Sequence, residues 1–221
     1  MSLRPLTLLE ARALGVLVEK ASTVPDSYPL SLNSLVAGCN QKTARDPVMN
    51  ATDAEVQSAA DALKALNLAF ESSGSRVSRY EHNLGRALAL PSQSVALLAV
   101  LMLRGPQTAS ELRGNCERLH RFADTSSVEA FLDELATRAD EKGGPLVIKL
   151  PRAPGAREAR WTHLLSGTVD VSAMPVASSD DDFVATSELA ALKAQQLSLK
   201  REVDELRALV ERLYQELGVS R

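Results

Sequence analysis

The first ninety residues alternate between amphipathic segments of helical period and short extended segments. Apolar residues that recur every three or four positions predict helices over residues 8–21, 31–39 and 52–69. Ser31 is placed to cap the second helix, and Thr52 with Glu55 forms a capping box for the third. Two extended segments, 68–71 and 76–83, are separated by polar residues and predict a β-hairpin.

The same order of elements returns further along the chain. Helices are predicted over 93–104, from a cap at Thr108 through Cys116, and from a second capping box at Ser126–Glu129; strands are predicted over 146–150 and 159–165. The two stretches also align residue by residue, with three offsets that change only across loops. Among the matched pairs are Ser31 with Thr108, Cys39 with Cys116, Tyr80 with Trp161, and His82 with His163.

Three helices and a hairpin, repeated once, are the element order of a pair of winged helix-turn-helix domains. We therefore expect a mainly α fold with small β-hairpins, in the α+β class. Winged-helix domains are predicted over 1–90 and 91–167, an acidic flexible linker over 168–186, and a coiled-coil helix over 187–217.

The C-terminal segment carries a heptad repeat about four heptads long. Its predicted dimerisation seam consists of Leu189, Leu192, Gln196, Leu199, Val203, Leu206, Val210, Leu213 and Leu217. Valine at position a with leucine at position d favours a parallel two-stranded coiled coil, which predicts a homodimer. An amphipathic helix that folds back on its own domains is the alternative.

One group of motifs in the first domain resembles a known family. The motifs are Pro25-Asp-Ser-Tyr-Pro-Leu-Ser-Leu-Asn33, Cys39-Asn-Gln-Lys42, Arg45 and Pro47-Val48-Met49, preceded by Glu19-Lys20. They look like the signature of the YceH-like proteins, which are bacterial proteins of unknown function built of two winged-helix domains. The resemblance spans most of residues 6–167. It implies the fold and a cytoplasmic bacterial setting, and it brings no established activity.

Composition and motifs argue against an enzyme or a membrane protein. The chain is 45% hydrophobic and 24% charged, as in ordinary soluble domains, and it has no apolar run long enough to span a membrane. Glu10 and Arg12 interrupt the apolar residues near its beginning, so we expect no signal peptide. No metal-ligand spacing, phosphate-binding glycine loop or nucleophile motif is present. We expect no cofactor and no metal, and we interpret Cys39, Cys116, His82 and His163 as structural residues.

Charge is distributed unevenly, and this decides where nucleic acid could bind. Residues 1–90 are neutral, residues 91–167 carry a net charge of +1, and residues 168–221 carry −4. The third helix of each domain exposes more acids than bases, which disfavours its insertion into a groove of DNA. The candidate DNA-binding residues therefore lie on the loop after the second helix and on the two hairpins: Asn40, Gln41, Lys42, Arg45, Arg76, Arg79, Lys149, Arg152, Arg157 and Arg160.

Other interpretations of the same residues stay open. Asn40 and Gln41 can instead bridge the backbone of their own loop. The cluster of Arg113, Arg118 and Arg121 can be a solvated face. The sequence predicts a DNA-binding, regulator-like dimer, and the alternative is a protein-interaction adaptor. DNA binding predicts positive potential that joins the 40–45 loop to a hairpin, whereas an adaptor predicts an apolar patch near Tyr28 and Pro47-Val48.

Overall fold

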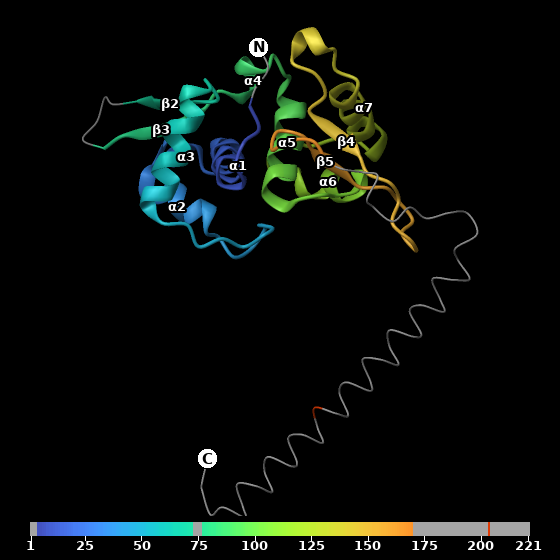
Figure 1. The fold of residues 1–221 in the computed structure, drawn as a ribbon, viewed down its shortest axis with the longest axis horizontal. Helices are drawn as coiled ribbons and strands as arrows, with labels where there is room; N and C mark the ends of the chain where they lie inside the picture. The colour runs from blue at the N-terminus through green and yellow to red at the C-terminus, as the bar shows by residue number, and fades with distance from the viewer. Residues whose placement is uncertain (1–3, 73–76, 170–202, 204–221) are drawn as a thin grey trace, which may run out of the picture. The chain divides into compact units, whose positions relative to one another are not determined.

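A computed structural model of the 221-residue chain describes residues 4–72, 77–169 and 203. Of these, the residues up to Pro151 and from Glu158 onward to 169 belong to one compact unit, and Arg152–Arg157 belong to a second. The first unit is mainly helical with two small antiparallel sheets (Figure 1). Among the described residues, no helix is both long and apolar enough to cross a membrane.

The first half of this unit begins and ends its helices at clear capping signals. Its elements are α1 (Leu8–Thr23), η1 (Pro25–Ser27), β1 (Leu30–Ser31), α2 (Leu32–Cys39), α3 (Asp53–Ala65), β2 (Ala69–Ser72), β3 (Arg79–His82) and α4 (Leu84–Ala87). The side chain of Ser31 accepts a hydrogen bond from the amide of Ser34, and Thr52 and Glu55 form the predicted capping box. Both predicted caps are therefore confirmed.

Three short strands form the sheet of the first half, in the order β1-β3-β2. In β3, Tyr80 lies opposite Leu30 on one side, and His82 lies opposite Ala69 on the other. The hairpin of β2 and β3 was predicted, but β1 was not. A strand of two residues has no periodicity of its own, and it forms here because β3 supplies a partner from about fifty residues away.

The second half repeats this arrangement with α5 (Ser92–Arg104), α6 (Ala109–Asn115), α7 (Thr125–Ala136), η2 (Asp140–Lys142), β4 (Val147–Lys149) and β5 (Trp161–His163). Gly105 ends α5 with φ +71, a left-handed conformation that glycine adopts without strain. Gln107 then pairs with Trp161 in an antiparallel bridge. Since Tyr80 and Trp161 are matched positions of the repeat, this bridge takes the place that β1 has in the first half.

The start of α7 corrects one prediction. The capping box predicted at Ser126–Glu129 is wrong, because the helix begins at Thr125 and is capped by Asp124. The carboxylate of Asp124 accepts a hydrogen bond of 2.7 Å from the amide of Ser127. This bond also holds the pKa of Asp124 below its ordinary value. Aspartate is among the best N-cap residues, so the helix begins directly after Asp124, and Ser126 lies within its first turn.

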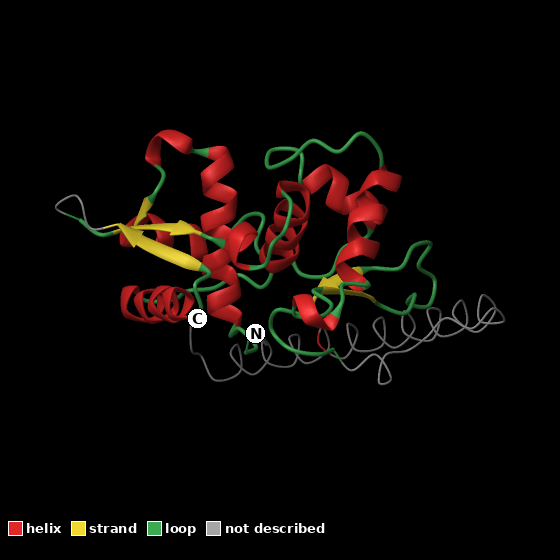
Figure 2. Ribbon diagram, turned by 90° about the horizontal axis from the view of Figure 1, so that it is seen from above, coloured by secondary structure: helices red, strands yellow, loops and turns green. Residues whose placement is uncertain are grey.

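The two halves share one hydrophobic core. Helices α1 and α5 pack against each other and are buried over most of their length. Gly15 of α1 makes this close approach possible, because a Cβ atom there would lie 3.0 Å from Cγ of Leu103 and 3.3 Å from the carbonyl oxygen of Ala99. Figure 2 shows the two sheets apart from each other with helices between them.

The predicted coiled coil falls almost entirely outside the described residues. Of its nine seam residues only Val203 is described, and it is helical with 44% of its surface exposed. The coiled coil therefore stays a prediction.

Candidate nucleic-acid interface

The loop between α2 and α3 is held together by its own polar side chains. Asn40 donates to the carbonyl of Ala51 at 2.8 Å, and its side-chain oxygen accepts from the amide of the same residue at 2.7 Å. Gln41 contacts Thr43 and accepts weakly from Lys20 and Arg45. Both amides thus bridge local structure, which was the alternative to base recognition. Lys42 is the exposed member of this predicted group.

Arg45 lies inside the protein. Its side chain has no exposed surface, and two of its nitrogens bind the carboxylate of Glu19 in α1 at 2.6 and 3.2 Å. It also donates to the carbonyl of Gly38 at 3.0 Å. Burial would raise the pKa of Glu19, but the hydrogen bonds and charge of Arg45 outweigh it and hold that pKa below its ordinary value. In this conformation Arg45 is not accessible to a DNA phosphate, and its geometry favours a structural role.

Arg12 is a buried cation of the same region that sequence reasoning missed. It is fully buried in α1 and donates to the carbonyls of Cys39 at 3.2 Å and Pro47 at 2.8 Å. Burial lowers the pKa of Arg12, and the positive charge of Arg45 adds to this effect. The sequence signal that could have revealed it is the position of Arg12 on the apolar face of the helix predicted over residues 8–21.

Each hairpin is fixed to the segment before the second helix by an arginine. Arg79 donates to the carbonyl of Pro29 at 2.8 Å, and Arg160 donates to the carbonyl of Pro106 at 2.8 Å. The two arginines and the two prolines are matched positions of the repeat. Both arginines remain exposed, and Arg160 also binds Glu111 at 2.9 Å.

The other predicted cations of the hairpins differ in their surroundings. Lys149 is exposed and lies 5.3 Å from the centre of the Trp161 ring, within the range of a cation–π contact. Arg152 and Arg157 are exposed and belong to the second compact unit. Arg76 lies outside the described residues.

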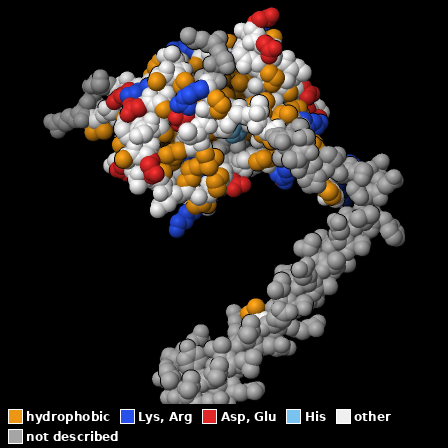
Figure 3. Space-filling model, in the orientation of Figure 1, with side chains coloured by type: hydrophobic (Ala, Val, Ile, Leu, Met, Phe, Trp, Pro, Cys, Tyr) orange, Lys and Arg blue, Asp and Glu red, His pale blue; other side chains and the backbone are white. Residues whose placement is uncertain are grey.

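The third helices carry the acidic faces that the sequence predicted. On α3, Lys64 is bound by both Asp61 and Glu71, so its charge is already neutralised. On α7, Glu129, Asp133 and Glu134 are exposed. On the face shown in Figure 3, basic side chains are scattered among acidic and apolar ones.

A shallow groove of about 390 Å³ joins the 40–52 loop to the second half. The loop is attached there by the amide of Asp46, which donates to the carbonyl of Leu103 at 2.8 Å. The polar side chains that line the groove include Asp46, Arg104, Gln107, Glu111, Asn115 and Arg160. The groove therefore links the loop to a hairpin, but it contains acids as well as arginines, so the predicted positive potential between loop and hairpin stays a prediction.

A second basic area lies on α6 and the loop after it. Arg113 and Arg121 line a depression of about 220 Å³ beside Gly114 and Glu117. A Cβ atom at Gly114 would meet nothing within 4 Å, so the helix surface is open there.

The two cysteines are buried, and the two histidines at matched positions of the repeat, His82 and His163, are half-buried. Burial raises the pKa of both Cys39 and Cys116 to about 12, which keeps the thiols protonated and unreactive. Burial lowers the pKa of His82, and it lowers that of His163 to about 4. The described residues contain no group of three or more His, Cys, Asp or Glu side chains that could hold a metal ion.

Comparisons with known proteins agree with the sequence motifs. The family model described as "Protein of unknown function, DUF480" matches residues 6–156. The chain is 64% identical over 220 residues to a UPF0502 protein of Leptothrix cholodnii, covering 98% of this chain and 97% of that protein. It is 65% identical over 219 residues to a UPF0502 protein of Burkholderia multivorans, covering 99% and 92%. The resemblance to the YceH-like proteins is thereby confirmed, and the chain belongs to the DUF480 (UPF0502) family of proteins of unknown function.

Proposed function

We propose that the protein is a cytoplasmic DNA-binding protein built from two winged-helix modules, and that it contacts the backbone of duplex DNA with its second half. The observation that carries this proposal is the repeated hairpin arrangement. In both halves an arginine of the hairpin donates to a proline carbonyl before the second helix, at the same distance of 2.8 Å. Two copies of one unit of three helices and a hairpin are what a pair of winged helices requires.

The charges of the second hairpin support its assignment as the contact. Lys149, Arg152 and Arg157 are exposed, and within the described part of the chain none forms an ion pair with a carboxylate. Such cations are free to neutralise phosphates. The acidic faces of α3 and α7 make backbone contact by the hairpin more favourable than insertion of either helix into the major groove.

Fluorescence anisotropy with a random 30-base-pair duplex tests the proposal at low and at physiological salt. The double variant Arg152→Glu/Arg157→Glu should weaken binding and should reduce the slope of log affinity against log salt by roughly 1.8, about 0.9 for each phosphate that the variant no longer neutralises. The matched control is Arg118→Glu/Lys142→Glu, which changes the net charge equally at two other exposed positions.

Three results would count against the proposal or its site. Equal weakening in the control would show a dependence on net charge alone. Unchanged affinity in the hairpin variant would exclude the hairpin. Absence of binding at low salt would exclude DNA binding. Lys42→Glu tests the loop separately, whereas Arg45→Glu would place two carboxylates together inside the protein and is unsuitable.

Dimerisation through residues 187–217 is part of the proposal. Its support is the heptad pattern in the sequence, with leucine at every d position from Leu192 to Leu213. A parallel dimer would present each hairpin twice, and this raises the effective affinity of weak phosphate contacts.

A protein-interaction adaptor is the second candidate. The specific observation in its favour is the neutralised or acidic surface of α3 and α7, together with Val48, which is 58% exposed beside Pro47. Tyr28 does not add to this patch, because it is half-buried and its hydroxyl accepts from the amide of His82 at 2.7 Å. Absence of DNA binding at low salt would favour the adaptor.

A further inference from the structure

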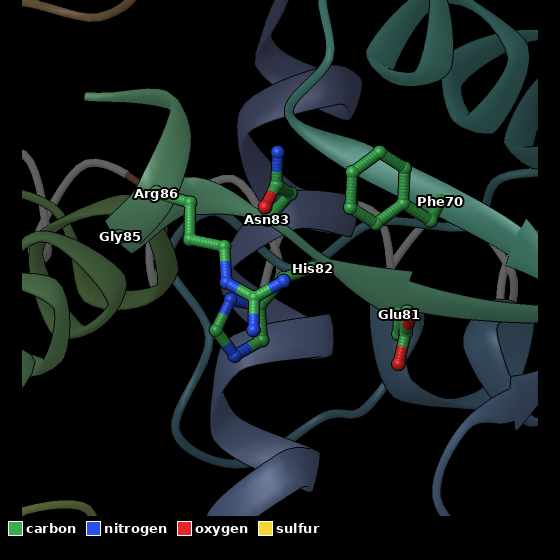
Figure 4. A pocket seen from close by; sticks show the side chains of 6 residues that line it. All are labelled: Phe70, Glu81, His82, Asn83, Gly85 and Arg86. Carbon is green, nitrogen blue, oxygen red and sulfur yellow. The ribbon is translucent and has the colours of Figure 1, made fainter. Parts of the chain in front are cut away.

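A pocket of about 310 Å³ lies where the first hairpin passes into α4. It is lined by Phe70 of β2, Glu81 and His82 of β3, Asn83, and Gly85 and Arg86 of α4 (Figure 4). This volume is at the lower end of the range of small-molecule sites, roughly 300–1,000 Å³. None of the residues proposed above to contact duplex DNA lines it.

Phe70 gives the pocket an aromatic wall. Among the described aromatic residues it is the exposed one, at 42%, whereas the others are buried or half-buried. The ring lines a concave site, so a flat ligand in the pocket can cover it. Glu81 lies directly opposite Phe70 across the two strands, so both side chains share one face of the sheet.

Arg86 supplies positive charge on the other side. It is exposed and forms no ion pair with the acids of the described residues. Figure 4 shows Phe70 and Arg86 at opposite sides of the group, with Asn83 between them and the guanidinium of Arg86 over the His82 ring. The base of the pocket is fixed, because Asn83 donates to the carbonyl of Asn67 at 2.8 Å and the amide of His82 donates to Tyr28 at 2.7 Å.

The second half of the protein provides an internal comparison. Its hairpin has the same pairing, and the residues that match Phe70, Glu81 and Arg86 are Ile148, Thr162 and Gly167. The histidine is the same in both halves, as His82 and His163. The repeated hairpin is therefore built without an aromatic ring or a carboxylate at the first two positions, whereas α4, which carries Arg86, has no counterpart in the second half.

We propose that this pocket binds a guanine nucleotide. The base stacks on the Phe70 ring, as bases do on exposed aromatic side chains. The N1–H and the 2-amino group of guanine are adjacent donors, and together they match the two acceptor oxygens of the Glu81 carboxylate. The guanidinium of Arg86 binds the phosphate. The nucleotide is either free or an unpaired guanosine of a single strand, since both present the same groups.

Calorimetric titration of the full-length protein with GMP, AMP and guanosine tests each contact separately. GMP should bind at least tenfold more tightly than AMP, because adenine presents an acceptor at N1 where guanine presents a donor. Phe70→Ala should weaken GMP binding about tenfold. Glu81→Gln should abolish the preference for GMP over AMP. Arg86→Met should weaken GMP binding but leave guanosine binding unchanged.

Val48→Ala and Lys142→Met are the matched controls, since they remove an exposed apolar and an exposed basic side chain elsewhere. Both should bind GMP as the unaltered protein does, and thermal melting checks that all variants fold. A single-stranded DNA of thymidines with one guanosine at its centre, compared with a strand of thymidines alone, shows whether the pocket takes an unpaired guanosine of a strand or only a free nucleotide. Guanosine-dependent binding of that strand, abolished by Phe70→Ala, supports the proposal even where free GMP is bound weakly.

Two results would overturn the proposal. One is the absence of binding of both GMP and the guanosine-containing strand. The other is GMP binding that is unaffected by Phe70→Ala or equal to that of AMP. Duplex binding by the second hairpin is measured with other variants, so failure of either proposal leaves the other testable.

Discussion

Arg45 shows how a charged residue of a polar loop can belong to the protein interior. Its guanidinium is surrounded by the carboxylate of Glu19 and the carbonyls of Gly38 and Ala44, so each of its nitrogens has a partner. A buried cation is tolerated when it is paired and hydrogen-bonded in this way. The pair connects the loop to α1 and sets where the loop lies.

Removing this cation should destabilise the fold. We expect Arg45→Ala to lower the free energy of unfolding by about 3 kcal/mol, because it leaves the carboxylate of Glu19 partly buried without a counter-charge. Urea denaturation followed by circular dichroism measures the change. Lys42→Ala, in the same loop but exposed, should stay within about 0.5 kcal/mol of the unaltered protein. Equal stability of the two variants would contradict a structural role for Arg45.

Protonation of His163 should make stability depend on pH. Burial lowers the pKa of His163 to about 4, whereas an unfolded histidine has a pKa near 6.5. The unfolded chain therefore binds the proton first, so stability is complete above pH 6.5 and falls as the pH is lowered toward 4, by about 3 kcal/mol in all. His163→Gln should lose this part of the pH dependence, and His120→Gln should retain it. If the free energy of unfolding depends on pH in the same way in both variants, His163 is not the group responsible.

Sequence reasoning located the side chains that act locally and missed those that depend on distant partners. Thr52, Thr108 and Ser31 were found as caps because a cap and its helix are adjacent in sequence. Arg45 was predicted to contact DNA because its partner Glu19 is 26 positions away and nothing local marks the pair. The pocket at Phe70 was missed for the same reason, since strand register and the turn into α4 together create it.

At the scale of elements, glycines set how closely helices approach. A Cβ atom at Gly38 of α2 would lie 2.5 Å from Cγ1 of Val16, a fully buried residue of α1. That distance is too short, and the branched side chain of Val16 has little freedom to move away. The packing of α1 against α2 therefore requires glycine at this position.

Two glycine-to-alanine variants should change stability in opposite directions. Gly38→Ala should destabilise the protein by about 1–3 kcal/mol through overpacking. Gly114→Ala in α6 should stabilise it by up to about 1 kcal/mol, because the site is open and alanine favours a helix. Differential scanning calorimetry gives both shifts in Tm. A Tm that rises in Gly38→Ala would show that α1 and α2 are not packed as described.

At the scale of the whole molecule, the C-terminal heptads should determine the oligomeric state. Deletion of residues 187–221 should convert a dimer into a monomer, because the predicted seam is removed. Light scattering coupled to size exclusion measures the mass of each form. The substitutions Leu199→Asp and Leu206→Asp should have the same effect within the full chain. A full-length protein that is already monomeric would contradict the predicted coiled coil.

The shared core of α1 and α5 has a consequence for how the chain can be divided. A break between Leu90 and Pro91 would separate the two copies of the repeat and leave the apolar faces of both helices without their partner. Neither fragment would keep its own stable fold in water, since each loses the burial that the other provides. The two fragments should instead regain structure when they are mixed. If each fragment were fused to a different protein, their refolding would then signal that the two fused proteins had come together.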